Sequence, residues 1–346
     1  MMNSYKRLRF RLGALHRVKF AKMVRSFGTD QIWSSRKVMK MLLTSVLFSL
    51  LASAPALGKE YRLTRNDQVV VIDMHFLMPA SRRESVLSWL RFSTDALASV
   101  FGRWPRSEWR IEITPISMYS KDSIPWAQVN RGDPDTVAFY IDAMASERAL
   151  VENWTTYHEL SHLLIPYRGW GDLWFSEGLA SYYQNLLQAR SGVIDERLMW
   201  QKLHDGFERG RDNPRPDLNL AELSPNMREN RSFMRVYWSG AWYFLSADIA
   251  LRKESGGNVT LDSALGMLNS CCRDRAMSAR EIAKKLNFLT DSTLFTDLFA
   301  RARASRAVPP VSGLFSDLGI TIEDGTVSLL PDHAGSAIRR DIVDTE

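Results

Sequence analysis

Cysteine is almost absent from this sequence: the 346 residues include only Cys271 and Cys272, which are adjacent. Neighbouring cysteines pair with each other only under strain, and no further cysteine is available as a partner. The sequence therefore excludes a fold held together by a framework of disulfides. We expect two buried thiols at these positions.

Basic charge is also scarce once the N-terminal segment is set aside. Residues 1–58 carry 11 Lys and Arg against one acid, Asp30, so the remaining 288 residues hold 34 basic and 38 acidic side chains. The formal net charge of +6 thus belongs to the N-terminal segment, and the rest of the chain is slightly acidic. This distribution removes the main support for nucleic-acid binding, which we do not expect.

A long apolar run is missing too, since the best candidate, residues 41–58, is short for a membrane span. It follows three basic residues at 36–40 and ends in small residues, with a candidate A-x-A cleavage site at 54–56. Residues 1–58 are therefore predicted to be a basic leader with a signal peptide or a signal anchor. We expect the protein to be exported (periplasmic or extracellular in a bacterium) or membrane-anchored by an uncleaved segment.

The part of the leader before Met39 is long for a signal peptide. Two explanations stay open. Either translation starts at an internal methionine such as Met39 or Met41, or the basic segment lies on an anionic membrane surface.

Strand and helix patterns divide the rest of the chain, which contains no internal repeat or low-complexity linker. Residues 59–145 are predicted to be a strand-rich lobe, residues 146–310 a helical lobe, and residues 311–346 a C-terminal tail packed on the domain, where Asp324-Gly325 predicts a hairpin turn. β-branched residues and alternation predict strands at 68–77, 107–118 and 135–142. We expect an α+β fold, a small sheet lobe followed by a mainly helical lobe.

Helical spacing and start signals predict the helices. One helix in the strand-rich lobe begins with Ser81 and Glu84 in capping-box spacing and ends at Gly102, and Ser278 and Glu281 repeat this spacing later. The helices predicted after residue 145 cover about 146–165, 172–191, 194–209, 230–254, 260–270, 278–287 and 291–304.

The sequence "HELSH" at residues 158–162 is the most informative motif. On a helix, His158 and His162 project from one face about one turn apart, so both imidazoles can reach one metal ion. The carboxylate of Glu159 can then approach a metal-bound water. Burying these side chains without partners would cost several kcal/mol, which metal binding would offset. The alternative is a pair of surface or capped core histidines.

The third ligand of such a site is predicted on the following helix, because a catalytic zinc needs three protein ligands and an open position. Glu177 in "LWFSEGLASYY" lies one to two turns inside that helix. Asp172 is nearer in sequence but stands at the helix start, where aspartate is most simply a cap. We therefore predict one zinc ion held by His158, His162 and Glu177.

These segments resemble a known group of enzymes. "HELSH" followed by "LWFSEGLASYY" resembles the gluzincin zinc metallopeptidases, and the continuation "YWSGAWYFLSADIALRKESGGNVTLDSAL" is most similar to the glycyl aminopeptidase family, with aminopeptidase N more distant. The resemblance covers roughly residues 154–265. It implies a thermolysin-like catalytic domain with zinc on His158, His162 and Glu177, and with Glu159 as the general base.

Tyr237 in "RVYWSGAW" is similar to the tyrosine of a Tyr-x-Lys-Gly segment in those families, although Ser239 replaces the lysine. The resemblance implies that its phenol donates a hydrogen bond to the oxyanion of the tetrahedral intermediate. The alternative is an aromatic side chain that only packs in a Trp-rich helix.

The chain also departs from the family pattern. The loop at 166–172 is shorter, no Gly-x-Met-Glu-Asn-like segment precedes the motif, and neither a full N-terminal β-sandwich nor a PDZ tail is recognisable. In those families the missing glutamate holds a free amine of the substrate, so exopeptidase and endopeptidase action both stay open. The strand at 135–142 is either a sheet edge that pairs with an extended peptide or an ordinary covered strand.

The sequence as a whole predicts a zinc peptidase, exported or membrane-associated, in which Glu159 activates a zinc-bound water and Tyr237 assists. Its partners are a peptide or protein substrate and, through the leader, a membrane. The alternatives are a catalytically inactive binding or scaffolding protein with this fold, and a membrane-surface protein that acts through residues 1–38. The remaining histidines after the leader, His75, His204 and His333, are expected to be structural or exposed because none has a second ligand nearby in sequence.

Overall fold

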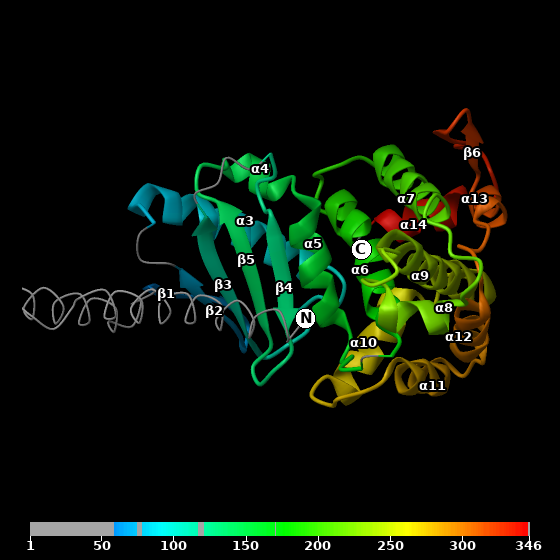
Figure 1. Cartoon of the computed structure of the whole chain (residues 1–346), viewed down its shortest axis with the longest axis horizontal. Coiled ribbons are helices and arrows are strands. Elements are labelled where there is room, and N and C mark those ends of the chain that lie inside the picture. Colours follow the sequence, from blue (N-terminus) through cyan, green and yellow to red (C-terminus); the bar gives the residue numbers. More distant parts are fainter. Residues whose placement is uncertain (1–58, 75–77, 117–120, 170, 345–346) are drawn as a thin grey trace, which may run out of the picture. The chain divides into compact units, whose positions relative to one another are not determined.

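A five-stranded mixed sheet forms the N-terminal part of the fold (Figure 1). The structure is a computed structural model that describes residues 59–344 except 75–77, 117–120 and 170. The strand order is β1-β2-β3-β5-β4, with β2, β3 and β5 parallel and the two outer pairs antiparallel. The strands are β1 (Lys59–Arg65), β2 (Gln68–Met74), β3 (Glu108–Ile116), β4 (Trp126–Asn130) and β5 (Thr136–Asp142).

Three of these strands were predicted and are confirmed as β2, β3 and β5, although residues 75–77 and 117–118 lie outside the described part. Strand β4 was not predicted, because it has only five residues and no fully buried position. It pairs along the whole of β5, with Gln128 opposite Ala138. Of the two alternatives for residues 135–142, the structure therefore supports the covered strand and not the sheet edge. β5 is a covered strand, and β4 is the edge.

Helix α3 (Ala80–Ala98) is the crossover that allows β2 and β3 to lie parallel. Its Trp89 is fully buried and meets Phe139 of β5 edge to face, with ring centroids 5.3 Å apart. The predicted capping box at Ser81 is wrong. Pro79 takes the N-cap position with an extended backbone, so Ser81 already lies inside the helix.

Helices form the rest of the described chain. They are α4 (Glu147–Val151), α5 (Trp154–Ser161), η1 (His162–Leu164), α6 (Leu173–Arg190), α7 (Glu196–Arg211), α8 (Leu220–Leu223), η2 (Ser224–Asn226), α9 (Phe233–Ser255), α10 (Leu261–Cys272), α11 (Ala279–Thr290), α12 (Leu294–Ala304), α13 (Ser312–Asp317) and α14 (Ser336–Val343). Each helix predicted after residue 191 is confirmed within a few residues, and Ser278 caps α11 in a capping box with Glu281. The short helices α8, α13 and α14 were not predicted.

The helix predicted at 146–165 is divided in two at Asn153. The Asn153 side chain accepts a hydrogen bond from the backbone N–H of Thr155 (2.9 Å) and so caps a new helix, α5. This break gives α5 a direction of its own, beside the edge strand β4 (Figure 1).

Helices α6 and α9 pack closely because glycines face each other at their contact. A Cβ atom on Gly178 would lie 2.2 Å from the Cα atom of Gly240, and one on Gly240 would lie 2.0 Å from the carbonyl oxygen of Trp174. Only glycine at both positions allows the two backbones to approach this far. Glu177 and Tyr237 lie next to this contact in sequence, so the glycines bring the helices that carry them together.

The C-terminal segment contains the predicted hairpin. Strands β6 (Ile320–Glu323) and β7 (Thr326–Leu329) are antiparallel, and both turn residues, Asp324 and Gly325, have positive φ. In the described part, no helix is both long and apolar enough to cross a membrane. The predicted leader, residues 1–58, and His75 lie outside the described residues.

The prediction of two free, buried thiols is wrong. Cys271 and Cys272 end helix α10 with Cα atoms 3.7 Å apart, and the structure joins them in a disulfide. Cys272 is buried and Cys271 is exposed.

Candidate metal centre

Two histidines project from the end of helix α5. His158 lies in its last full turn, and His162 follows at the start of η1 with its backbone still helical, so the one-turn spacing is kept. Both side chains are buried, and their ring centroids are 5.0 Å apart.

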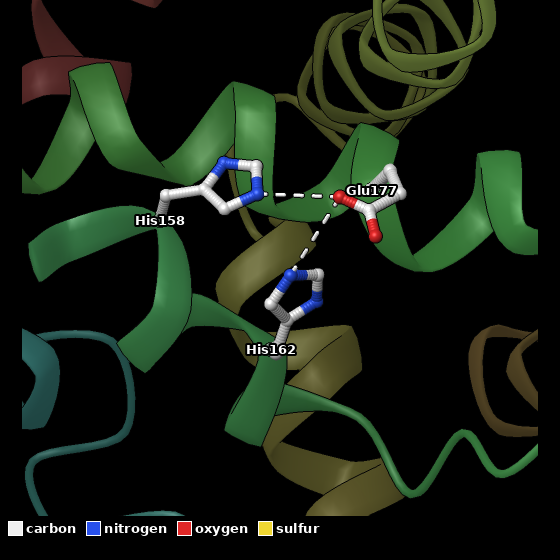
Figure 2. A group of neighbouring side chains, drawn as sticks. All are labelled: His158, His162 and Glu177. Carbon is white, nitrogen blue, oxygen red and sulfur yellow. Dashed lines mark hydrogen bonds and ion pairs between the residues drawn. The ribbon is translucent and has the colours of Figure 1, made fainter. Parts of the chain in front are cut away.

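Glu177 approaches both rings from helix α6 (Figure 2). Its Oε2 atom lies 3.3 Å from Nε2 of His158 and 3.8 Å from Nε2 of His162. One ligand atom from each of the three residues lies within 4.8 Å of the other two. The structure thus brings together the three residues that the sequence predicted as metal ligands, in a group with the chemistry of a zinc site.

Two further side chains orient the imidazoles, and the sequence did not predict them. Nδ1 of His158 lies 2.8 Å from Oε1 of Gln184, and Nδ1 of His162 lies 2.9 Å from the Ser176 hydroxyl. With Nδ1 of each ring bonded to these oxygens, each Nε2 atom faces Glu177. Such outer hydrogen bonds are typical of metal-ligating histidines, so the residues present fit a metal ion. Gln184 is seven residues after Glu177 on the same helix, which was the available sequence signal.

Burial and the three charges set the protonation of the centre. Burial lowers the pKa of His162 to about 3. Burial acts to raise the pKa of Glu177, but its hydrogen bond with His158 and the charges of both histidines outweigh this and lower it. The pKa of His158 is raised, because the hydrogen bond and charge of Glu177 overcome the effect of burial. A neutral His162 and an ionised Glu177 are in the states required for metal binding, and His158 would release its Nε2 proton when a metal binds.

Glu159 and Tyr237 adjoin the same group. Burial raises the pKa of Glu159 to about 7, while its carboxylate interacts with His158 and Glu177. The ring of Tyr237 stacks on that of His158, with centroids 5.9 Å apart and planes at 17°. Burial, followed by the charge of Glu177, raises the pKa of the phenol, which therefore stays protonated as a hydrogen-bond donor.

Asp172 does not join the ligand group, and its predicted role as a cap is only partly correct. It occupies the N-cap position of α6 but makes no capping hydrogen bond. Its carboxylate instead accepts hydrogen bonds from the Trp174 indole (3.1 Å) and from Arg303. Asp172 thus ties the start of α6 to helix α12.

The short loop before α6 is held by the segment preceding α11. The backbone N–H of Arg168 donates to the carbonyl of Met277, and the N–H of Met277 donates to the carbonyl of Pro166, both at 3.1 Å. These bonds support the tight connection between the two ligand-bearing helices.

An arginine cluster fixes the end of the motif helix to the sheet, and the sequence did not predict it. The buried carboxylate of Asp135 accepts hydrogen bonds from Arg106 (2.9 Å), Arg131 (3.1 Å) and Arg168 (3.1 Å). Arg131 also donates to the carbonyl oxygen of His162. Burial acts to raise the pKa of Asp135, but Arg131 and Arg106 lower it, so the carboxylate is ionised. The ligand His162 is thereby linked to the β4–β5 turn.

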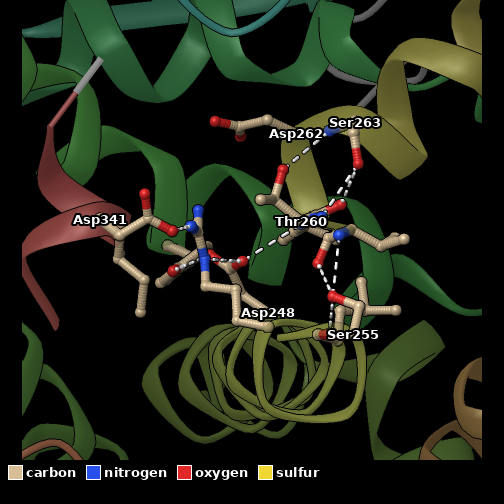
Figure 3. Close-up of polar contacts among 12 residues, drawn as sticks. Asp248, Ser255, Thr260, Asp262, Ser263 and Asp341 are labelled. Atoms are coloured by element: carbon tan, nitrogen blue, oxygen red, sulfur yellow. Dashed lines mark hydrogen bonds and ion pairs between the residues drawn. The ribbon is translucent and has the colours of Figure 1, made fainter. Parts of the chain in front are cut away.

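A second buried polar cluster lies further along helix α6 (Figure 3). Asp248 accepts from the Tyr182 hydroxyl (2.8 Å), from Arg252 Nε (2.9 Å) and from the backbone N–H of Leu261 (3.1 Å). Asp262 accepts from the Tyr183 hydroxyl (2.6 Å) and forms an ion pair with Arg190 (2.7 Å). Both carboxylates have cationic partners here, so this cluster joins α6, α9 and α10 and is not a candidate metal centre.

The other predicted noncatalytic positions are structural. His204 is buried on α7 beside Asp205 and Phe315, and Nδ1 of His333 accepts a hydrogen bond from the N–H of Gly335. The Ser239 hydroxyl donates to the carbonyl of Arg235 one turn earlier and also bonds its guanidinium. Ser239 therefore does not face the metal centre.

Several known structures are similar to this fold. An aminopeptidase N family protein from Idiomarina loihiensis has 15% identity and a TM-score of 0.57, over 77% of this chain and 50% of its own. Yeast LTA4 hydrolase has 12% identity and a TM-score of 0.51, and the match covers 75% of this chain and 42% of that protein. An M1 zinc metallopeptidase from Deinococcus radiodurans has 20% identity and a TM-score of 0.47, and the match covers 73% of this chain and 52% of that protein. The predicted α+β fold is confirmed, and the chain spans about half the length of these structures.

The fold and the group of His158, His162 and Glu177 are similar to those of gluzincin metallopeptidases. The sequence profile of the M61 glycyl aminopeptidases matches residues 169–238. This segment contains Glu177, Gln184 and Tyr237 but begins after the two histidines. The resemblance predicted from the sequence, with the glycyl aminopeptidases nearest, is therefore confirmed. No curated protein matches this chain.

Proposed function

We propose that this protein is a zinc-dependent peptidase in which Glu159 activates the attacking water. The observation that carries this proposal is the convergence of two imidazole Nε2 atoms and one carboxylate within 4.8 Å, with Nδ1 of each histidine already hydrogen-bonded. His158, His162 and Glu177 would hold the ion. When bound, zinc would supply Lewis acidity to a substrate carbonyl and lower the pKa of water.

The neighbouring side chains have roles that follow from their placement. Glu159 comes directly after a ligand and its carboxylate interacts electrostatically with His158 and Glu177, so it would accept a proton from water and pass it to the leaving nitrogen. The protonated phenol of Tyr237, stacked on His158, would donate a hydrogen bond to the oxygen that becomes negative in the transition state. One such donor is typically worth about 3–4 kcal/mol.

The edge strand β4 would position the substrate. It ends the sheet beside α5, and within the described residues its backbone has hydrogen-bond partners only in β5. An extended peptide could therefore add to this edge as a further strand, which aligns a backbone without requiring a particular sequence. This arrangement accommodates both exopeptidase and endopeptidase action.

The test is the variant Glu159→Gln, which keeps the shape of the side chain but removes its basicity. We expect the purified variant to bind one zinc per chain, as the wild type does, and to hydrolyse no member of a peptide library. The wild type should lose activity with a chelator and regain it with zinc. A wild type that binds zinc but cleaves nothing would instead favour the inactive binding or scaffolding protein.

We also propose that the protein acts after export, or at the membrane through an uncleaved leader. This proposal is supported by the basic cluster and apolar run of residues 36–58. Mass spectrometry of the N-terminus of the protein isolated from its native cells would test it. A mature chain that starts after Ala56 or Gly58 is the result expected for a cleaved signal peptide, and recovery only in the cytosol would contradict export.

A further inference from the structure

Tryptophans in the described part of the chain divide into two groups. Seven of them are buried to 3% exposure or less, whereas Trp126 and Trp154 are each 47% exposed. An exposed tryptophan leaves a large apolar surface in water, and its indole usually finds a partner when it is buried. In the described residues neither of these two indoles makes a hydrogen bond. The fold therefore gives no account of why these two positions carry tryptophan.

Trp154 lies directly against the candidate metal centre. It is the first residue of α5 and stands one turn before His158 on the same face. Its ring meets that of His158 edge to face, with centroids 5.7 Å apart and planes at 86°. His158 is only 4% exposed, so Trp154 stands between a buried ligand and the solvent.

Trp126 begins the edge strand, but its side chain lies on the opposite face of the sheet from Ala127, which pairs with Phe139 on the face that α3 covers. The strand itself runs beside α5. Two sets of hydrogen bonds tie β4 to α5: Asn153 donates to the Ser123 hydroxyl (2.8 Å) just before β4, and Arg131, just after it, donates to the carbonyl of His162. The length of β4, about 13 Å at 3.4 Å per residue, matches the rise of about 12 Å from Trp154 to His162. The strand and the helix therefore run side by side in the same direction, and both tryptophans occupy their first positions.

We infer that Trp154 forms an aromatic subsite that accepts a large apolar side chain of the substrate. This inference rests on the proposed peptidase function. A peptide paired with β4 passes the Trp154 indole before it reaches the ligand histidines. Trp154 precedes His158 by about 6 Å along the helix axis, which corresponds to about two residues of extended peptide. The favoured substrates are therefore peptides with Phe, Leu or a similar residue within two positions of the scissile bond.

The experiment compares Trp154→Ala with the wild type on quenched fluorescent peptides that differ only in carrying Phe, Leu or Ser near the scissile bond. We expect kcat/KM for the Phe and Leu peptides to fall about tenfold or more, and for the Ser peptides by less than about threefold. Trp154→Phe should retain most of the preference. Phe288→Ala removes an aromatic side chain that is 76% exposed on α11. This control variant should hydrolyse every peptide with the wild-type kcat/KM.

Zinc content, measured on each variant, separates this role from a structural one. Full zinc occupancy together with an equal loss on Phe and Ser peptides would overturn the subsite. Binding of the same peptides to zinc-loaded Glu159→Gln, with and without Trp154→Ala, tests the subsite independently of turnover. Trp154-dependent binding of Phe peptides to a protein that never cleaves them would support the subsite and sink the peptidase. Hydrolysis of the peptides that does not depend on Trp154 would support the peptidase function and contradict the subsite.

Discussion

Helix α6 contributes to two buried polar clusters that differ in how their charges are satisfied. In the cluster around Asp248 and Asp262, the carboxylates are bonded to tyrosine hydroxyls and to the guanidinium groups of Arg252 and Arg190. In the metal centre, the ligand atoms of His158, His162 and Glu177 face one another, and no arginine or lysine among the residues that the structure describes is bonded to Glu177.

The difference shows that buried polarity alone does not identify a functional site. The Asp248 cluster holds three helices together and leaves no group able to bind a further ion. In the metal centre, the Nδ1 atoms of both histidines are hydrogen-bonded, and their Nε2 atoms converge on Glu177. This is the arrangement that a metal cation requires. The two clusters should therefore respond in opposite ways to loss of a carboxylate.

Replacing the ligand should have the largest effect on function. We expect Glu177→Gln to abolish zinc binding and hydrolysis, because the neutral amide is a poor zinc ligand. The free energy of unfolding of the metal-free protein should change by only about 1 kcal/mol, since glutamine can still bond His158. Zinc analysis, activity assays and urea denaturation measure the three quantities, and a variant that keeps stoichiometric zinc would contradict the assignment.

Replacing the structural carboxylate should show the opposite pattern. Asp248→Asn leaves Arg252 buried with a weakened partner, so we expect a loss of about 3–5 kcal/mol in the free energy of unfolding. Zinc stoichiometry and kcat per folded molecule should stay near the wild-type values. A stable variant with reduced zinc would show that the two clusters are not separate.

The contact between α6 and α9 should affect both stability and rate. A methyl group on Gly240 would collide with the carbonyl of Trp174, so Gly240→Ala should cost about 1–3 kcal/mol and displace Tyr237 from His158. We expect kcat to fall by up to about 100-fold, as small misplacements can cost this much. The matched control is Gly266→Ala on α10, where the added methyl meets only a side-chain atom of Phe101 at 3.7 Å and should leave kcat unchanged.

The hydrogen bond behind His158 should have the smallest effect. Gln184→Ala removes the acceptor of Nδ1–H, and we expect zinc affinity to fall about 10- to 100-fold while the fold is retained. Gln188→Ala, one turn further along α6, removes a bond to the carbonyl of Glu152 and should leave zinc affinity unaltered. Competition with a chromophoric chelator measures both, and equal affinities in the two variants would remove the role given to Gln184.

Local patterns in the sequence predicted what depends on one helix at a time. The spacing of His158 and His162 and the helix that carries Glu177 follow from period and capping signals. Gln184, Ser176 and the Asp135 cluster could not be predicted this way, because their roles depend on how α5, α6 and the sheet pack. Strand β4 was missed since its five residues are too few for a clear alternation, and with it the true edge of the sheet.

The most direct test of the account is an anomalous-scattering map, at the zinc edge, of a crystal grown with one equivalent of zinc. The account predicts one strong peak about 2.0–2.2 Å from Nε2 of His158, Nε2 of His162 and a carboxylate oxygen of Glu177. A map with no peak among these three residues, in crystals of a protein that binds zinc in solution, would contradict it.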